Sequence, residues 1–194
     1  MTGSGHGFNL RWNAGCNCRG MSNAGVIYHD FIDLKEQAAE IYLNMASRFS
    51  PEIPSFSALW LDMGMREKQH SELLRLCVAE GMIAPDLPAQ EEMEAARDLV
   101  ERLSRDAAVP DLSIEEAFRI AVELERSEFN GIYDRLSTPA HDSLYLFRRK
   151  VISLSSHLEE ILKHARDLNV SDLAISELER LVDRHMSRDW PKAG

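Results

Sequence analysis

A glutamate and a histidine interrupt the apolar stripe of one predicted helix. Glu67 and His70 are three residues apart, so on a helix both side chains project from the same face. The same face carries Trp60 and Leu74, which identifies it as the side that faces the core. Because a carboxylate in an apolar interior is costly without a partner, this pair predicts a compensating group nearby.

Three further segments repeat this pattern at the middle of their apolar stripes. Glu36 lies in the first segment, Glu125 and Glu128 lie in the third, and His157 lies in the fourth. A bundle aligns the midpoints of its helices, so we expect these side chains to converge. Carboxylates gathered in a dry core repel one another unless they are protonated or neutralised by cations.

Carboxylate and imidazole ligands suit iron, manganese and zinc. We therefore predict a centre of two iron ions, with manganese or zinc as alternatives, and six ligands. The predicted ligands are Glu36, Glu67, His70, Glu125, Glu128 and His157.

One position departs from the ligand pattern of known di-iron bundles. Those bundles use a Glu-x-x-His pair on each of two helices, whereas the residue three before His157 is Leu154. We expect Glu128 to replace the missing carboxylate, with Glu160 as the second candidate. The sequence leaves open whether Leu154 abolishes one metal position.

The prolines divide the chain into helical segments, because helix interiors reject proline. The predicted helices span about 28–49, 55–80, 90–107, 113–136, 138–168 and 171–186. Ser113 and Glu116 have capping-box spacing, and Thr138 followed by Pro139 predicts the start of the fourth long helix.

No segment has the alternation of a β-hairpin, so the predicted class is all-α. Short joins predict two antiparallel hairpins, and hence an up-down-up-down ferritin-like four-helix bundle with a long helical crossover between helices two and three and a short C-terminal helix. We assign this bundle to residues 27–188. Residues 1–26 contain six of the ten glycines and are expected to form a flexible extension.

Composition excludes several other classes. The net charge is -10, from 32 acidic and 22 basic residues, and no block of Lys and Arg predicts nucleic-acid binding. No apolar run is long enough to predict a membrane span. Three sparse cysteines, Cys16, Cys18 and Cys77, favour a reducing compartment, so we expect a cytoplasmic protein.

Over residues 28–165 the chain resembles the rubrerythrin branch of the ferritin-like superfamily. The resemblance rests on Glu36-Gln-Ala-Ala39, Glu67-Lys-Gln-His70 and Glu125-Arg-Ser-Glu128-Phe-Asn-Gly-Ile-Tyr133. It implies a non-haem di-iron centre that reacts with peroxide or oxygen, and a role for both Glu125 and Glu128 at the iron. It also implies a homodimer. The chain has no Cys-x-x-Cys pair for a rubredoxin domain, so the electron donor is expected to be a separate protein.

Two other functions stay open at this point. The chain could bind or store iron without turnover, so the sequence does not decide whether it is an enzyme. It could also be a structural or interaction bundle with a degenerate metal site, in which Glu–His hydrogen bonds satisfy the buried groups.

Overall fold

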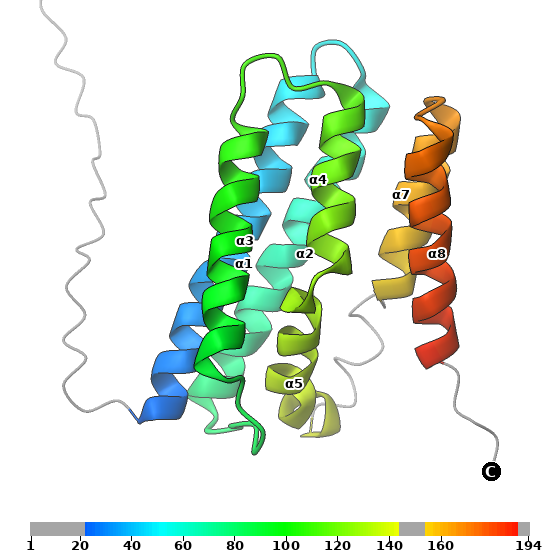
Figure 1. Cartoon of the computed structure of the whole chain (residues 1–194). Coiled ribbons are helices and arrows are strands. Elements are labelled where there is room, and N and C mark those ends of the chain that lie inside the picture. Colours follow the sequence, from blue (N-terminus) through cyan, green and yellow to red (C-terminus); the bar gives the residue numbers. More distant parts are fainter. Residues whose placement is uncertain (1–21, 144–153, 190–194) are drawn as a thin grey trace, which may run out of the picture.

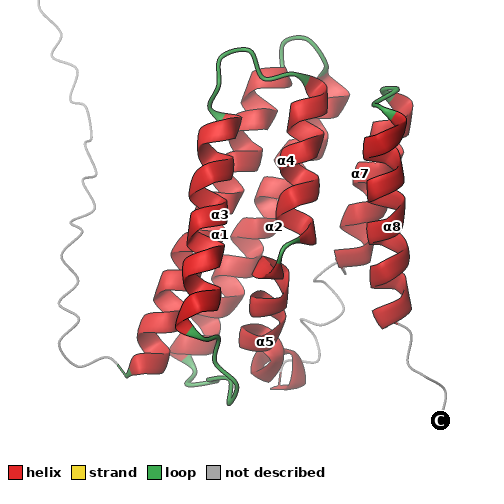
Figure 2. Ribbon diagram, viewed as in Figure 1, coloured by secondary structure: helices red, strands yellow, loops and turns green. Residues whose placement is uncertain are grey.

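The computed structural model describes residues 22–143 and 154–189 of the 194, and every regular element in these ranges is a helix. Figures 1 and 2 show the helices packed side by side along their lengths. The elements are α1 (Asn23–Phe49), α2 (Pro54–Ala79), α3 (Gln90–Ala107), α4 (Ile114–Arg126), α5 (Glu128–Ser143), α7 (Leu154–Asp167) and α8 (Asp172–Asp189). The predicted all-α class is confirmed, while the finer ferritin-like arrangement stays a prediction.

The longest helices, α1 and α2, form an antiparallel pair that supplies much of the core. Ser22 caps α1 by accepting a hydrogen bond from the Gly25 amide, so this helix begins five residues earlier than predicted. The two helices approach closely at Gly64, where an added Cβ would lie 2.9 Å from Leu43 Cγ and 3.1 Å from the Ala39 carbonyl oxygen. The missing side chain is what permits this contact.

The predicted third helix is broken at Ser127, between α4 and α5. Ser127 has an extended backbone (ψ 165°), and its hydroxyl donates to the Leu124 carbonyl and accepts from the Phe129 amide. A serine hydroxyl that competes for backbone groups in this way offers the chain an alternative to helical hydrogen bonds. The break is visible in Figure 1 as the bend between the labels α4 and α5.

The predicted helix start at Thr138 and Pro139 is wrong. Both residues lie inside α5, and the Thr138 hydroxyl donates to the Asp134 carbonyl one turn earlier instead of capping a new helix. The later part of this predicted helix is described as α7 (Leu154–Asp167), which pairs with α8 through a short turn at Asn169.

No helix in the described ranges is both long enough and apolar enough to cross a membrane.

Candidate functional site

A buried lysine lies at the centre of the polar core. Lys35 of α1 is completely inaccessible to solvent, and its Nζ lies 3.0 Å from Glu67 Oε2 of α2. The same Nζ donates to Asn130 Oδ1 of α5 at 3.2 Å. A lysine is rarely buried unless it is paired, so these two contacts explain how this one is tolerated.

Aromatic rings complete the surroundings of the Lys35 ammonium. Its Nζ lies 4.1 Å from the centre of the Phe129 ring and 4.9 Å from that of Tyr133. The electron-rich ring faces attract a cation, and the attraction is stronger where water is excluded. The Tyr133 ring also packs on His70, with 4.2 Å between ring centres. The centre of a third ring, that of Phe31, lies 5.9 Å from Lys35 Nζ, so the ammonium is surrounded by one carboxylate, one amide oxygen and three rings.

A second buried carboxylate, Glu125 of α4, adjoins this ion pair. Glu125 is 2% exposed; Tyr42 donates to its Oε1 at 2.9 Å, and Asn130 Nδ2 donates to its Oε2 at 2.9 Å. In an uninterrupted helix, positions five apart are rotated by about 140° and do not face one another. The break at Ser127 is what allows residues 125 and 130 to meet. Asn130 thus connects Glu125 with Lys35.

The two glutamates have opposite pKa shifts. Burial alone would raise the pKa of Glu67, but the Lys35 ammonium and His70 outweigh it and lower this pKa to about 2. At Glu125, burial and then the negative charge of Glu67 raise the pKa to about 7, against the smaller opposing effects of Lys35, Tyr42 and Asn130. The core therefore holds one ionised carboxylate firmly and a second that titrates near neutrality.

Stability should fall as the pH rises through the titration of Glu125. The folded chain binds this proton more tightly than the unfolded chain, whose carboxyl has a pKa near 4.5. The stabilising contribution is thus fully present below about pH 4.5 and is lost as the pH rises through 7. Glu125→Gln removes the titration, so the decline in unfolding free energy between pH 5 and pH 8 should shrink by about 1–3 kcal/mol in urea titrations.

The matched control is Glu123→Gln on the same helix. Glu123 is partly exposed and pairs with Arg102, which lowers its pKa, so this change should leave the decline between pH 5 and pH 8 in place. An equal slope in wild type and Glu125→Gln would contradict the pKa assignment of Glu125.

Three of the six predicted ligands come together in the core. Glu67, His70 and Glu125 are all buried, and His70 Nδ1 lies 3.6 Å from Glu67 Oε1. Glu36 does not join them, because its side chain is 42% exposed and accepts from Arg75 Nη2 at 2.5 Å. Its predicted inward orientation is therefore corrected. The side chains of Glu128 and His157 lie outside the described residues.

Lys35 is not among the residues predicted from the sequence, although the sequence contains a signal for it. Tyr28, Lys35, Tyr42 and Phe49 recur at intervals of seven residues, and all four are buried. This seven-residue interval places position 35, rather than position 36, in the stripe that faces the core. Lys35 was not predicted to be buried, because a lysine in a helix is usually exposed.

The described contacts do not fit a pair of metal ions. In the described part of the chain, no group of three or more His, Cys, Asp or Glu side chains is arranged to hold a metal. The Lys35 ammonium lies against the Glu67 carboxylate, which the prediction assigned to metal, and its positive charge would repel a cation there. Asn130 and Tyr42 likewise bond both oxygens of Glu125.

Comparison with known proteins adds no assignment, since no family model, curated protein or solved structure matches the chain.

Proposed function

We propose that this protein is a metal-independent helical bundle that works as a binding or interaction protein, and that Lys35 supplies the positive charge in its core. The observation that carries the proposal is the buried contact between Lys35 Nζ and Glu67 Oε2 at 3.0 Å. The Lys35 ammonium offsets the charge of Glu67, and Tyr42 and Asn130 donate hydrogen bonds to Glu125, so neither buried glutamate needs a metal.

A rubrerythrin-like di-iron oxidoreductase remains the second candidate. It is favoured by the shared buried position of Glu67, His70 and Glu125 on two different helices. This candidate requires iron, peroxide or oxygen, and a separate electron donor. It also requires Lys35 to leave the carboxylate that it contacts.

Metal analysis separates the two candidates. After expression with added iron and anaerobic incubation with ferrous iron, the desalted protein should retain less than about a tenth of an equivalent per chain. Its melting temperature should be the same with and without a chelator, because no metal contributes to the folded state. Retention of one or two equivalents, with a lower melting temperature after chelation, would instead support the di-iron candidate.

A further inference from the structure

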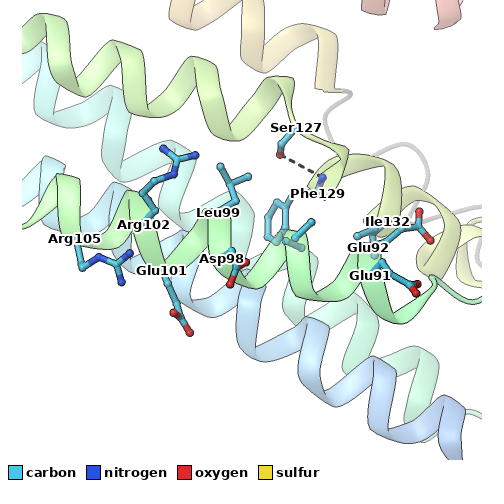
Figure 3. A pocket seen from close by; sticks show the side chains of 12 residues that line it. Glu91, Glu92, Asp98, Leu99, Glu101, Arg102, Arg105, Ser127, Phe129 and Ile132 are labelled. Carbon is cyan, nitrogen blue, oxygen red and sulfur yellow. Dashed lines mark hydrogen bonds between the residues drawn. The ribbon is translucent and has the colours of Figure 1, made fainter.

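An open groove lies between α3 and the junction of α4 with α5, and we call it the α3 groove. Its volume is about 870 Å³, and its apolar floor is formed by Ala96, Leu99, Phe129 and Ile132. Figure 3 shows Leu99 of α3 and Phe129 of α5 close to the break at Ser127. The groove lies beside the break at Ser127, where α5 bends away from the axis of α4. The groove and the buried ion pair share one residue, Phe129, which lines the groove and whose ring also contacts Lys35.

The rim of the α3 groove has an acidic excess. Glu92 is bound by Arg135 and Arg102 is bound by Glu123, so these groups are already compensated. Among the described residues, four charged residues that line the groove form no ion pair: three are acidic, and one, Arg105, is basic. The three acidic residues are Glu91, Asp98 and Glu101. An apolar floor with an acidic rim fits a segment that is both apolar and basic.

The first 21 residues of this chain have that chemistry. They contain no Asp or Glu, two arginines, and three large apolar residues at alternate positions. The apolar residues are Phe8, Leu10 and Trp12, and Arg11 lies among them.

The start of α1 lies at the end of the bundle where the α3 groove begins. The Ala84 amide, in the loop that leads to α3, donates to the Tyr28 hydroxyl near the start of α1. About two turns into each helix, Arg97 of α3 pairs with Asp30 of α1 at 3.4 Å. The two helices therefore run in parallel from the same end. Ten residues lie between Trp12 and Asn23. The eleven steps from one to the other reach up to about 36 Å when extended, and the groove from Glu91 to Arg105 is only about 21 Å long.

We propose that residues 8–12 dock in the α3 groove, with Phe8, Leu10 and Trp12 on its apolar floor and Arg11 at its acidic rim. The docked segment covers the floor at the break between α4 and α5. Displacement of the segment would free the groove for another apolar, basic segment. This inference stands on the groove and its charge, and it does not depend on whether the core binds metal.

Disulfide trapping in the full chain tests the proposal, because Cys16 and Cys18 follow the docked segment by only four and six residues. Ala95 is exposed and lines the groove, so Ala95→Cys provides a partner for them. Under mild oxidation at low protein concentration, peptide mapping should show an intramolecular disulfide from position 95 to Cys16 or Cys18. The matched control is Glu72→Cys, which is exposed on α2 outside the groove. The docked segment should raise the yield at position 95 about tenfold over this control.

A second change shows whether the trap depends on docking. Leu99→Glu, added to Ala95→Cys, places a charge on the apolar floor and should reduce the yield to that of Glu72→Cys, while circular dichroism verifies the helical content. Equal yields at positions 95 and 72 would overturn the proposal. Disulfides that join two chains on a non-reducing gel would also overturn it, because the occupant would then come from a second copy.

Discussion

Replacing Lys35 by methionine is expected to lower the free energy of unfolding by about 3–5 kcal/mol at pH 8, which corresponds to a melting temperature lower by roughly 6–20 °C. Methionine fills a similar volume but leaves the Glu67 carboxylate buried without its cation, and Asn130 loses the donor to its amide oxygen. The loss should be smaller at pH 5, because without the ammonium the Glu67 pKa rises and the carboxyl can be protonated. Urea unfolding followed by circular dichroism measures both effects.

Two controls isolate the buried ion pair. Lys68→Met removes an exposed lysine that pairs with Glu40 on the surface, and its cost should stay below about 1 kcal/mol. Adding Glu67→Met to Lys35→Met removes both charges, so most of the lost stability should return. A loss below about 1 kcal/mol for Lys35→Met alone would show that Glu67 does not depend on this ammonium.

Lys35→Glu is expected to make the core bind metal, which the wild-type protein is expected not to do. The change replaces the cation by a third buried carboxylate beside Glu67 and Glu125, with His70 close to Glu67. The apo-protein should be less stable than Lys35→Met, because the carboxylates now repel one another in a dry interior. Ferrous iron, manganese or zinc should then stabilise the variant, by about 2.7 kcal/mol at a free metal concentration one hundred times the dissociation constant.

Thermal unfolding with and without metal, together with elemental analysis, measures this gain. Lys68→Glu is the matched control, since it makes the same change on the exposed surface of α2 and should bind no additional metal. If wild type and Lys35→Glu retain equal amounts of metal, the ammonium is not what excludes metal from the core.

The sequence predicts the helices best where local signals and tertiary packing agree. The bounds of α3 are as expected, and the capping box at Ser113 and Glu116 does mark the start of α4. The predicted boundaries of the later helices were wrong at two places, Thr138–Pro139 and Ser127. Thr138 and Pro139 resemble a helix start but lie within a helix, whereas Ser127 gives no strong breaking signal and yet interrupts one.

The candidate site could be predicted only in part, because the sequence shows which helix positions face the core but not which side chains pair there. Glu67, His70 and Glu125 follow the apolar stripes of their helices, so their burial is readable from spacing alone. Spacing alone does not show whether Lys35 or its neighbour Glu36 is buried, because that depends on partners from other helices. Lys35 is buried because Glu67 and Asn130 meet it, whereas the half-exposed Glu36 side chain binds Arg75 at the surface. The sequence indicated that buried carboxylates need compensation, but it did not identify Lys35 as the partner of Glu67.

A crystal structure of the protein soaked anaerobically with ferrous iron, with data collected at the iron absorption edge, tests the role of Lys35 most directly. The expected result is electron density for Lys35 Nζ within hydrogen-bonding distance of both Glu67 and Asn130, and no anomalous peak beside either buried glutamate. An anomalous peak beside the Glu67 carboxylate, with the Lys35 side chain turned away from it, would show that a metal and not Lys35 compensates Glu67.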